Sequence, residues 1–145
     1  MQVKEIMNAN VISIGPDENV SLAARLLSRH NIGALPVCAE DGRLKGIVTD
    51  RDITLRCVAA DNDAGETKVR EVMTRGVISV TPDDDVREAV RTMSSEQVRR
   101  LPVTSGGHVV GMLSLGDLAQ TQDFSMEASS ALTDISSNVK RYGGR

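Results

Sequence analysis

Two seven-residue stretches of this chain carry residue types that could do chemistry, and they share one spacing. The stretches are GIVTDRD and GMLSLGD, and in both a hydroxyl residue precedes an aspartate by three positions. The hydroxyl and carboxylate pairs are Thr49 with Asp52 and Ser114 with Asp117. Ser or Thr followed three residues later by an acid is typical of a capping box. The spacing therefore predicts that a helix begins at each motif.

The same atoms also suit a nucleoside phosphate. A helix N-terminus presents unpaired N–H groups that favour phosphate, and a hydroxyl can donate to a phosphate oxygen. A carboxylate can accept hydrogen bonds from both hydroxyls of a ribose. Aliphatic residues near the motif could enclose a purine: Ile12, Ile14, Val37 and Ile47, with their repeats. The residue types alone leave both interpretations open, a simple helix cap and a nucleotide site.

The two motifs belong to an internal duplication. A shift of 66 residues aligns residues 3–37 with 69–103, and the four prolines of the chain pair as Pro16 with Pro82 and Pro36 with Pro102. A deletion of one residue in the following loop changes the shift to 65, which aligns the motifs. Such a repeat is the first feature to be read from a sequence, because it determines the architecture.

Each copy predicts the element order β-α-β-β-α. Short apolar strands are expected at Val11–Ile14 and Val77–Val80, each ending at a proline turn. Helices follow, with apolar residues at i, i+3, i+4 and i+7, and we expect Asn19 to cap the first and Asp85 the second, within a capping box that ends at Glu88. The remaining strands are expected at residues 34–38 and 44–48 in the first copy, and at 101–104 and 109–113 in the second.

These elements predict an α+β protein made of two repeats. We expect the copies to pack sheet to sheet with pseudo-two-fold symmetry, because one copy alone has a marginal core. The expected organisation is a first repeat at 1–60, a linker at 61–68, a second repeat at 69–122 and a tail at 123–145. Helical spacing of Ala128, Leu132, Ile135 and Val139 predicts a short packing helix in the tail, before a frayed end.

Composition narrows the functional classes. The net charge of −3 argues against broad nucleic-acid binding. With an aromatic content of 1%, the chain also lacks the aromatic side chains on which single-stranded nucleic acids usually stack. No apolar run approaches membrane-spanning length and the N-terminus has no signal-like segment, so we expect a cytoplasmic protein. The residues Cys38 and Cys57 lack ligand spacing, and neither a metal site nor a catalytic set is expected.

The duplicated sequence resembles a pair of cystathionine-β-synthase-type (CBS) domains. The match is carried by EIMNANVISIGPDENVSLAARLL, HNIGALPV and GIVTDRDI in the first copy. In the second copy it is carried by EVMTRGVISVTPDDDVREAVRTM, QVRRLPV and GMLSLGDLA. The resemblance implies a non-catalytic regulatory module that binds an adenine nucleotide or a related adenosyl ligand between the copies. It also implies a homodimer that regulates an unidentified protein, and no required cofactor.

Carried over residue by residue, the resemblance implies two ligand sites of unequal strength. Arg99 and Arg100 precede the LPV strand of the second copy, where the first copy has Gly33 and Ala34. Because such basic residues reach the phosphate held by the opposite aspartate, we expect the stronger site at Asp52. The stronger site comprises Ile12, Ser13, Ile14, Pro36, Thr49, Arg51, Asp52, Arg99 and Arg100. The weaker site comprises Ile78, Ser79, Val80, Pro102, Ser114 and Asp117.

Several alternatives stay open from the sequence. The ligand could be AMP, ADP, ATP, S-adenosylmethionine or a dinucleotide. A ligand-free dimerisation or interaction module, in which the motifs act only as caps, is a second hypothesis. A redox or stress-response protein that uses Cys38 and Cys57 is a third, and it predicts a disulfide in the non-reduced protein.

Overall fold

The structure, a computed structural model, describes residues 1–121 and 125–143, with the side chains of 137–143 and Ser125 left aside. The chain divides into two compact units. The copy-one unit consists of Val11–Val77 and Gly106–Val109. The copy-two unit consists of Met1–Asn10, Ile78–Ser105 and the described residues from Val110 onward. Each unit is described by itself below.

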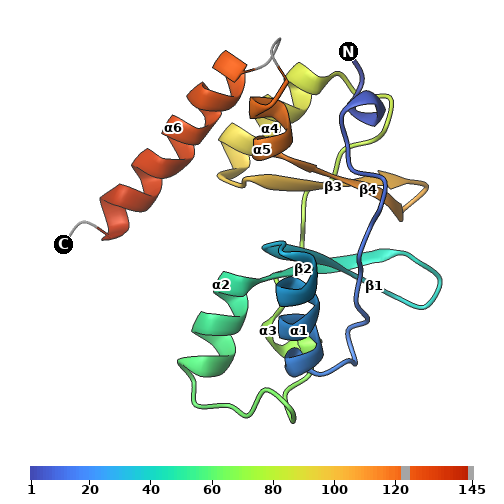
Figure 1. The fold of residues 1–145 in the computed structure, drawn as a ribbon, viewed down its shortest axis with the longest axis vertical. Coiled ribbons are helices and arrows are strands. Elements are labelled where there is room, and N and C mark those ends of the chain that lie inside the picture. Colours follow the sequence, from blue (N-terminus) through green and yellow to red (C-terminus); the bar gives the residue numbers. More distant parts are fainter. Residues whose placement is uncertain (122–124, 144–145) are drawn as a thin grey trace. The chain divides into compact units, whose positions relative to one another are not determined.

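Both units contain a helix, a β-hairpin and a shorter helix that begins at the motif, and the predicted α+β repeat fold is confirmed (Figure 1). The elements of the copy-one unit are α1 (Val20–His30), β1 (Ala34–Cys38), β2 (Leu44–Thr49), α2 (Asp50–Ile53), the π-helical segment η2 (Thr54–Val58) and α3 (Val69–Val72). Those of the copy-two unit are the 3-10 turn η1 (Val3–Glu5), α4 (Val86–Glu96), β3 (Arg100–Ser105), β4 (His108–Ser114), α5 (Leu115–Ala119) and α6 (Ser125–Gly143). The first two residues of β4, His108 and Val109, are counted with the copy-one unit.

The β-hairpins place the two motifs at the ends of their second strands. Strands β1 and β2 pair antiparallel, with Ala34 opposite Thr49 and a bulge between Val37 and Cys38. Strands β3 and β4 form the equivalent two-stranded sheet. The backbone N–H of Asp50 donates to the Gly33 carbonyl at 3.2 Å, so the start of α2 is joined to the start of β1.

The strands predicted at Val11–Ile14 and Val77–Val80 were wrong. Each segment makes a single parallel bridge to the neighbouring hairpin, Ile14 with Val37 and Val80 with Val103. The physical reason is that only one residue of each segment runs alongside the hairpin closely enough to exchange hydrogen bonds. The residues before it have no backbone hydrogen-bond partner in the described part of the chain, which leaves each sheet with two strands.

The caps of the two long helices differ from the prediction. Asn19 makes no side-chain cap on α1; the carbonyls of Thr67 and Ala64 accept hydrogen bonds from the first backbone N–H groups of the helix instead. Asp85 does cap α4 by accepting from Arg87 N, but without the reciprocal contact of a capping box. The segment between the copies therefore satisfies the donors that Asn19 was expected to satisfy.

Each unit incorporates the short segment that opens the other copy. In the copy-two unit, Val3 N donates to the Asp84 carbonyl and Lys4 N donates to the Pro82 carbonyl, both at 2.9 Å. The repeat-equivalent bonds of the copy-one unit run from Val69 N to the Glu18 carbonyl at 2.8 Å and from Arg70 N to the Pro16 carbonyl at 2.9 Å. Both opening valines are fully buried, so each segment contributes to the hydrophobic core of the unit that it joins.

The helix α6 packs along the copy-two unit, beside α4 and α5 (Figure 1). Ala128, Ala131 and Ile135 are buried on its inner face, whereas Leu132 is 42% exposed. The prediction that Leu132 packs inward was therefore wrong, because Ala131 lies on the buried face instead. α6 has 19 residues and is longer than the short helix expected, and the predicted packing residue Val139 has its side chain outside the described residues.

No described helix is long and apolar enough to span a membrane.

Candidate functional site

Both motifs form complete capping boxes, which confirms this interpretation of their spacing. Thr49 Oγ1 accepts from Asp52 N, and Asp52 Oδ2 accepts from Thr49 N, both at 3.0 Å. In the second copy Ser114 Oγ accepts from Asp117 N at 3.1 Å, and Asp117 Oδ2 accepts from Ser114 N at 3.2 Å. One oxygen of each carboxylate is thus bound within its own motif, and only the other is left for a further partner.

The helix N-terminus at the first motif has fewer free donors than the sequence suggested. The N–H of Asp50 donates to Gly33, that of Arg51 to Asp50 Oδ1 at 2.8 Å, and that of Asp52 to Thr49. The first three amides of α2 are therefore occupied by groups of the chain. A phosphate here would depend on side chains more than on backbone N–H groups.

The glycine that opens each motif allows a close backbone approach. A Cβ on Gly46 would lie 2.5 Å from the carbonyl oxygen of Thr74, and one on Gly111 would lie 3.2 Å from that of Asn8. Thr74 and Asn8 are repeat-equivalent, and each follows the opening segment contributed by the other copy. The glycine therefore permits this segment to pair with the hairpin, at Ile47 in the first copy and at Met112 in the second.

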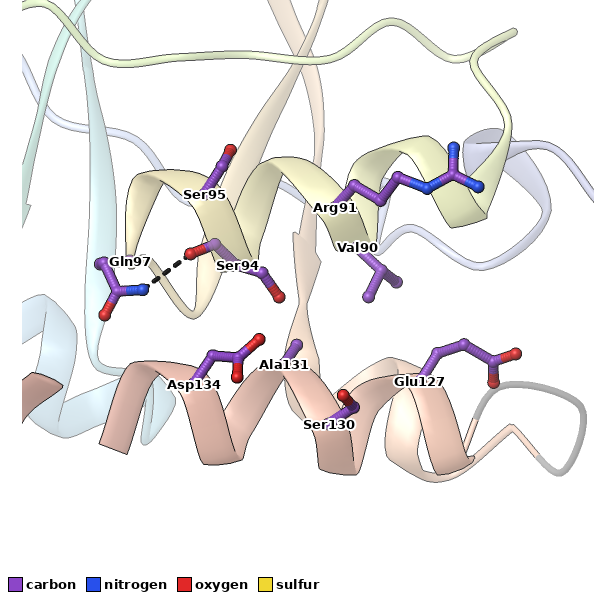
Figure 2. A pocket seen from close by; sticks show the side chains of 9 residues that line it. All are labelled: Val90, Arg91, Ser94, Ser95, Gln97, Glu127, Ser130, Ala131 and Asp134. Atoms are coloured by element: carbon purple, nitrogen blue, oxygen red, sulfur yellow. Dashed lines mark hydrogen bonds between the residues drawn. The ribbon is translucent and has the colours of Figure 1, made fainter. Parts of the chain in front are cut away.

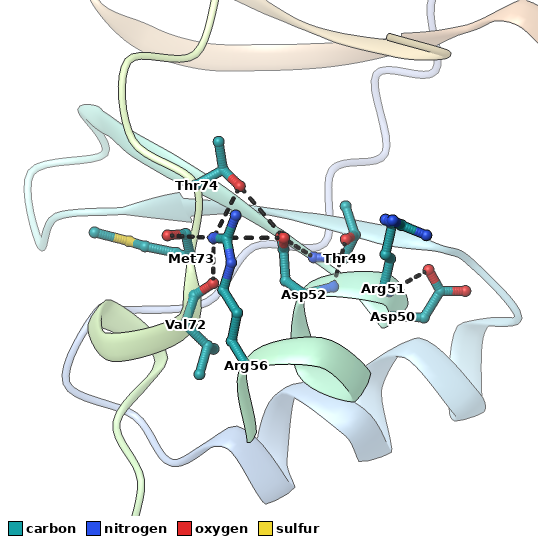
Figure 3. Close-up of polar contacts among 8 residues, drawn as sticks. All are labelled: Thr49, Asp50, Arg51, Asp52, Arg56, Val72, Met73 and Thr74. Atoms are coloured by element: carbon teal, nitrogen blue, oxygen red, sulfur yellow. Dashed lines mark hydrogen bonds and ion pairs between the residues drawn. The ribbon is translucent and has the colours of Figure 1, made fainter. Parts of the chain in front are cut away.

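The second oxygen of Asp52 lies in a polar cluster that the sequence analysis missed (Figure 3). Thr74 Oγ1 donates to Asp52 Oδ1 at 3.3 Å, and Arg56 Nη1 lies 3.5 Å from the same oxygen. Arg56 Nη1 also donates to Thr74 Oγ1 at 3.2 Å, and to the carbonyls of Val72 at 2.9 Å and Met73 at 3.2 Å. The Asp52 residue is 8% exposed, and its charge is balanced by an arginine of the same unit.

Arg56, not Arg51, is the basic residue next to the carboxylate. Arg51 is exposed, and Figure 3 shows its side chain on the side of Asp52 away from Arg56. Positions i and i+4 are neighbours on a helix, so the spacing of Asp52 and Arg56 was a signal that could have identified the pair. About half of the Arg56 side chain is exposed, and in the described part of the chain its Nε and Nη2 groups have no hydrogen-bond partner.

The second motif has no equivalent cluster. The residue at the position of Arg56 is Thr121, whose Oγ1 donates to the Asp117 backbone carbonyl at 3.1 Å. The residue at the position of Thr74 is Asn8, whose side-chain oxygen accepts from Asn10 N at 2.9 Å. Among the residues described, Asp117 Oδ1 has no hydrogen-bond partner and Asp117 forms no ion pair. The two aspartates therefore differ in charge balance and in the availability of their second oxygen.

The residues expected to line a base differ in their accessibility. Ile14 and Val80 are core residues, 5% and 6% exposed, and their backbone groups pair with the strands beside them. Ile12 is half-buried, and Ser13, Ile78 and Ser79 are exposed. In the described ranges, the backbone N–H and carbonyl groups of these last four residues have no hydrogen-bond partner. These backbone groups can therefore bond to a ligand, whereas the side chains of Ile14 and Val80 are buried in the core.

The predicted prolines of the sites, and Arg99 and Arg100, lie in or next to the first strand of a hairpin. Pro36 and Pro102 are buried strand residues whose carbonyls accept from Ile14 N and Val80 N. Arg99 is exposed and Arg100 is half-buried at the start of β3. Both arginines belong to the copy-two unit, whereas Asp52 belongs to the copy-one unit.

The two cysteines are free thiols in different surroundings. Cys57 is fully buried, and its Sγ–H donates to the Asn62 carbonyl at 3.5 Å. Cys38 is half-buried; burial raises the pKa of its thiol, and a hydrogen bond with Ser13 partly offsets the rise. A raised pKa lowers the thiolate fraction and with it the reactivity of Cys38.

A cavity of about 540 Å³ lies between α4 and α6 of the copy-two unit (Figure 2). Val90 and Ala131 contribute apolar surface, and Arg91, Glu127 and Asp134 contribute charged groups around it. None of the residues expected to bind a ligand lines this cavity. Among the residues that the structure describes, no cluster of three or more His, Cys, Asp or Glu side chains is arranged to hold a metal ion.

Comparison with known proteins identifies the family. The CBS domain matches this chain twice, over residues 3–58 and 69–122. CBS domain-containing protein YhcV of Bacillus subtilis is 43% identical over 134 residues, which cover 92% of this chain and 94% of that protein. Hypoxic response protein 1 of Mycobacterium tuberculosis is 37% identical over 117 residues, 81% of this chain and 82% of that protein.

Solved structures of CBS proteins share this fold. The crystal structure of Hypoxic Response Protein I with two coordinated zinc ions matches with a TM-score of 0.78 and 36% identity, over 83% of this chain and 98% of that one. The CBS domain pair of protein MJ0100, in complex with 5′-methylthioadenosine and S-adenosyl-L-methionine, matches with a TM-score of 0.76 and 30% identity, over 83% of this chain and 94% of that one. The chain belongs to the CBS domain family, and its two copies form a CBS domain pair.

Proposed function

We propose that this chain is a non-catalytic regulatory module that binds an adenosyl ligand at its repeated motifs. The observation that carries the proposal is that each unit contains both a motif aspartate fixed by its capping box and a short segment, 12–13 or 78–79, whose backbone groups have no hydrogen-bond partner among the described residues. An aspartate can hold the two ribose hydroxyls, and free backbone N–H and carbonyl groups can read the edge of a base. The adenosyl ligands of the MJ0100 domain pair, 30% identical to this chain, support this ligand class.

The proposed ligands are AMP, ADP, ATP or a related adenosyl compound, with the phosphate-bearing ligand held at Asp52. Arg51 precedes Asp52 in the motif and Arg56 follows it by four residues, and the proposal adds Arg99 and Arg100 from the copy-two unit. Charge-assisted contacts to phosphate are the strong hydrogen bonds of such sites. The Asp117 motif contains Leu115 and Gly116 and no basic residue, and it is proposed to bind phosphate weakly or not at all.

Regulation would follow from a ligand that binds two arrangements of the protein with different affinities. We further propose a cytoplasmic homodimer, with a regulated partner protein of unknown identity. A homologous structure, the CBS-CP12 protein from bloom-forming cyanobacteria, is hexameric, and it supports assembly as a property of such proteins.

A ligand-free interaction module is the second candidate function. It is favoured by the complete capping boxes, which account for the motif spacing without a ligand. It is also favoured by two exposed apolar side chains on η2, Leu55 at 50% exposure and Val58 at 63%. Under this hypothesis, dimer formation would be unaffected by nucleotides.

Isothermal titration calorimetry distinguishes the two candidates. AMP, ADP and ATP are titrated into the unaltered chain and into the Asp52→Ala and Asp117→Ala variants. We expect the unaltered chain to bind at least one of these nucleotides, and we expect this binding to be lost in Asp52→Ala and retained in Asp117→Ala. The opposite pattern contradicts the ranking of the sites. Absence of any heat, together with a dimer insensitive to nucleotides and no adenosyl compound copurifying by native mass spectrometry, supports the ligand-free module.

A further inference from the structure

The two motif aspartates are surrounded by different charges, although their capping geometry is the same. Asp52 Oδ1 faces a guanidinium, Arg56 Nη1, at 3.5 Å and a hydroxyl, Thr74 Oγ1, at 3.3 Å. At the second motif, the described residues place no cation within ion-pair distance of Asp117. Among the described residues, the charge of Asp52 is therefore compensated before a ligand binds, and that of Asp117 is not.

This difference affects the part of a ligand that differs among adenosyl compounds, its 5′ group. A phosphate brought near an uncompensated carboxylate meets like charge, whereas a neutral or cationic 5′ substituent does not. Near Asp52, the Arg56 side chain pairs with the carboxylate through Nη1 alone and is 48% exposed, so its remaining N–H groups can reach a second anion. Arginine presents five donors in a rigid fork, which permits it to serve two acceptors at once.

Arg56 also fixes the geometry of the first site. Its Nη1 donates to the carbonyls of Val72 and Met73, which precede Thr74. It thereby ties the segment that opens the second copy to the motif of the first. Thr121, at the equivalent position, instead donates to the backbone of its own helix and contacts nothing outside it through a hydrogen bond in the described residues.

We propose that the two motifs divide adenosyl ligands by the charge of their 5′ group, and that the residue pair Arg56 and Thr121 sets this division. The Asp52 site takes phosphate-bearing nucleosides, and the Asp117 site takes neutral or cationic ones. The inference rests on the proposed function, because it assigns ligand classes to the sites proposed there. It adds a specificity-determining residue, Arg56, that the motif does not contain.

A reciprocal exchange of the two residues tests the inference. AMP and 5′-methylthioadenosine are the probes, because they share adenosine and differ in the charge of the 5′ group. Calorimetry on Asp117→Ala reports the first site, and on Asp52→Ala the second, because each alanine removes the side-chain oxygens that would hold the ribose. The measured quantity is the ratio of the affinities for AMP and 5′-methylthioadenosine, because a general loss of structure lowers both affinities together and leaves their ratio unchanged.

We expect the ratio to favour AMP at the first site and 5′-methylthioadenosine at the second. Arg56→Thr, in the Asp117→Ala background, lowers the ratio about tenfold, as expected for one charge-assisted contact. Thr121→Arg, in the Asp52→Ala background, raises the ratio about tenfold. Arg56→Lys retains part of the preference because it keeps the charge without the fork.

The possible outcomes separate this inference from the proposed function. Equal ratios at both sites, or a ratio that neither exchange moves, overturn the division by charge while adenosyl binding itself stands. If neither compound binds the unaltered chain, the proposed function fails and the division fails with it. A ratio that follows the exchanged residue in both directions supports the inference.

Discussion

Replacement of Gly46 by alanine tests the most constrained contact of the copy-one unit. The added Cβ would lie 2.5 Å from the Thr74 carbonyl oxygen and 3.2 Å from Met73 Sδ. An ordinary contact needs at least 3.4 Å, so the backbone at Thr74 must move away from the hairpin. Gly46 has no positive φ, and the glycine is therefore required by space and not by backbone conformation.

The expected loss follows from the bonds that this movement strains. Ile47 N donates to the Thr74 carbonyl at 3.0 Å and Thr74 N donates to the Ile47 carbonyl at 2.8 Å. Each such bond contributes about 0.5–1.5 kcal/mol, and overpacking costs about 1–3 kcal/mol. Alanine also lowers the conformational entropy of the unfolded chain, which offsets part of this loss by about 0.4–1 kcal/mol. We expect Gly46→Ala to lower the free energy of unfolding by about 2–4 kcal/mol.

Gly111→Ala is the matched control in the other unit. Its Cβ would meet mainly the flexible Met7 side chain, with Sδ at 2.6 Å, while the nearest backbone oxygen, that of Asn8, is 3.2 Å away. Because a methionine side chain can rotate aside, we expect a loss smaller by about 1–2 kcal/mol. Urea unfolding followed by far-UV circular dichroism measures both, since the chain has no tryptophan. Equal losses, or a greater loss in Gly111→Ala, would refute the argument from backbone contact.

Three further predictions follow from other contacts. Asp52→Ala should lower the free energy of unfolding by about 2 kcal/mol and Asp117→Ala by about 1 kcal/mol, measured by urea unfolding, because both lose a cap but only Asp52 has further partners; equal losses would contradict this. Val3→Ala should lower it by about 1–3 kcal/mol, because a fully buried side chain is truncated, and thermal melting that is unchanged would place Val3 outside the core. The raised pKa should make Cys38 react with iodoacetamide more slowly in the folded than in the unfolded protein at about pH 8.5, and Ser13→Ala should slow it further; mass spectrometry across a pH series measures both rates, and a faster reaction in Ser13→Ala would contradict the role of the hydrogen bond.

The linkage of Cys38 to stability has a definite sign. Its thiol has a higher pKa in the folded protein than in the unfolded one, so the folded state holds the proton more tightly. The resulting contribution to stability is present below the unfolded thiol pKa of about 8.5 and declines as the pH rises above it.

The repeat made much of the fold predictable. Two independent copies of each apolar pattern located both long helices, both hairpins and both motif helices. The strands expected at residues 11–14 and 77–80 were wrong because an apolar run shows burial but not whether a partner strand lies alongside it for its full length. The cap expected from Asn19 failed because backbone carbonyls from residues 64–67, distant in sequence, satisfied the same donors.

The candidate site was predictable in its motif and not in its surroundings. The hydroxyl and carboxylate spacing identified both capping boxes. The role of Thr74 depends on a segment of the second copy lying against the first hairpin, which local patterns do not contain. Arg56 carried a local signal in its i, i+4 spacing from Asp52, but Arg51, adjacent in the motif, was the residue chosen.

The exchange of opening segments has a consequence for synthesis on the ribosome. Residues 1–10 are made before residues 11–77, whereas their hydrogen-bond partners at Pro82, Asp84 and Met112 are made after them. Val11–Val77, by contrast, contains almost all of its own unit and can begin to fold while translation continues. Val3 therefore has to wait for its hydrogen-bond partner Asp84 until the second copy emerges. A chain that stops after the first copy would leave Val3 and its neighbours without the partners that they have in the folded protein.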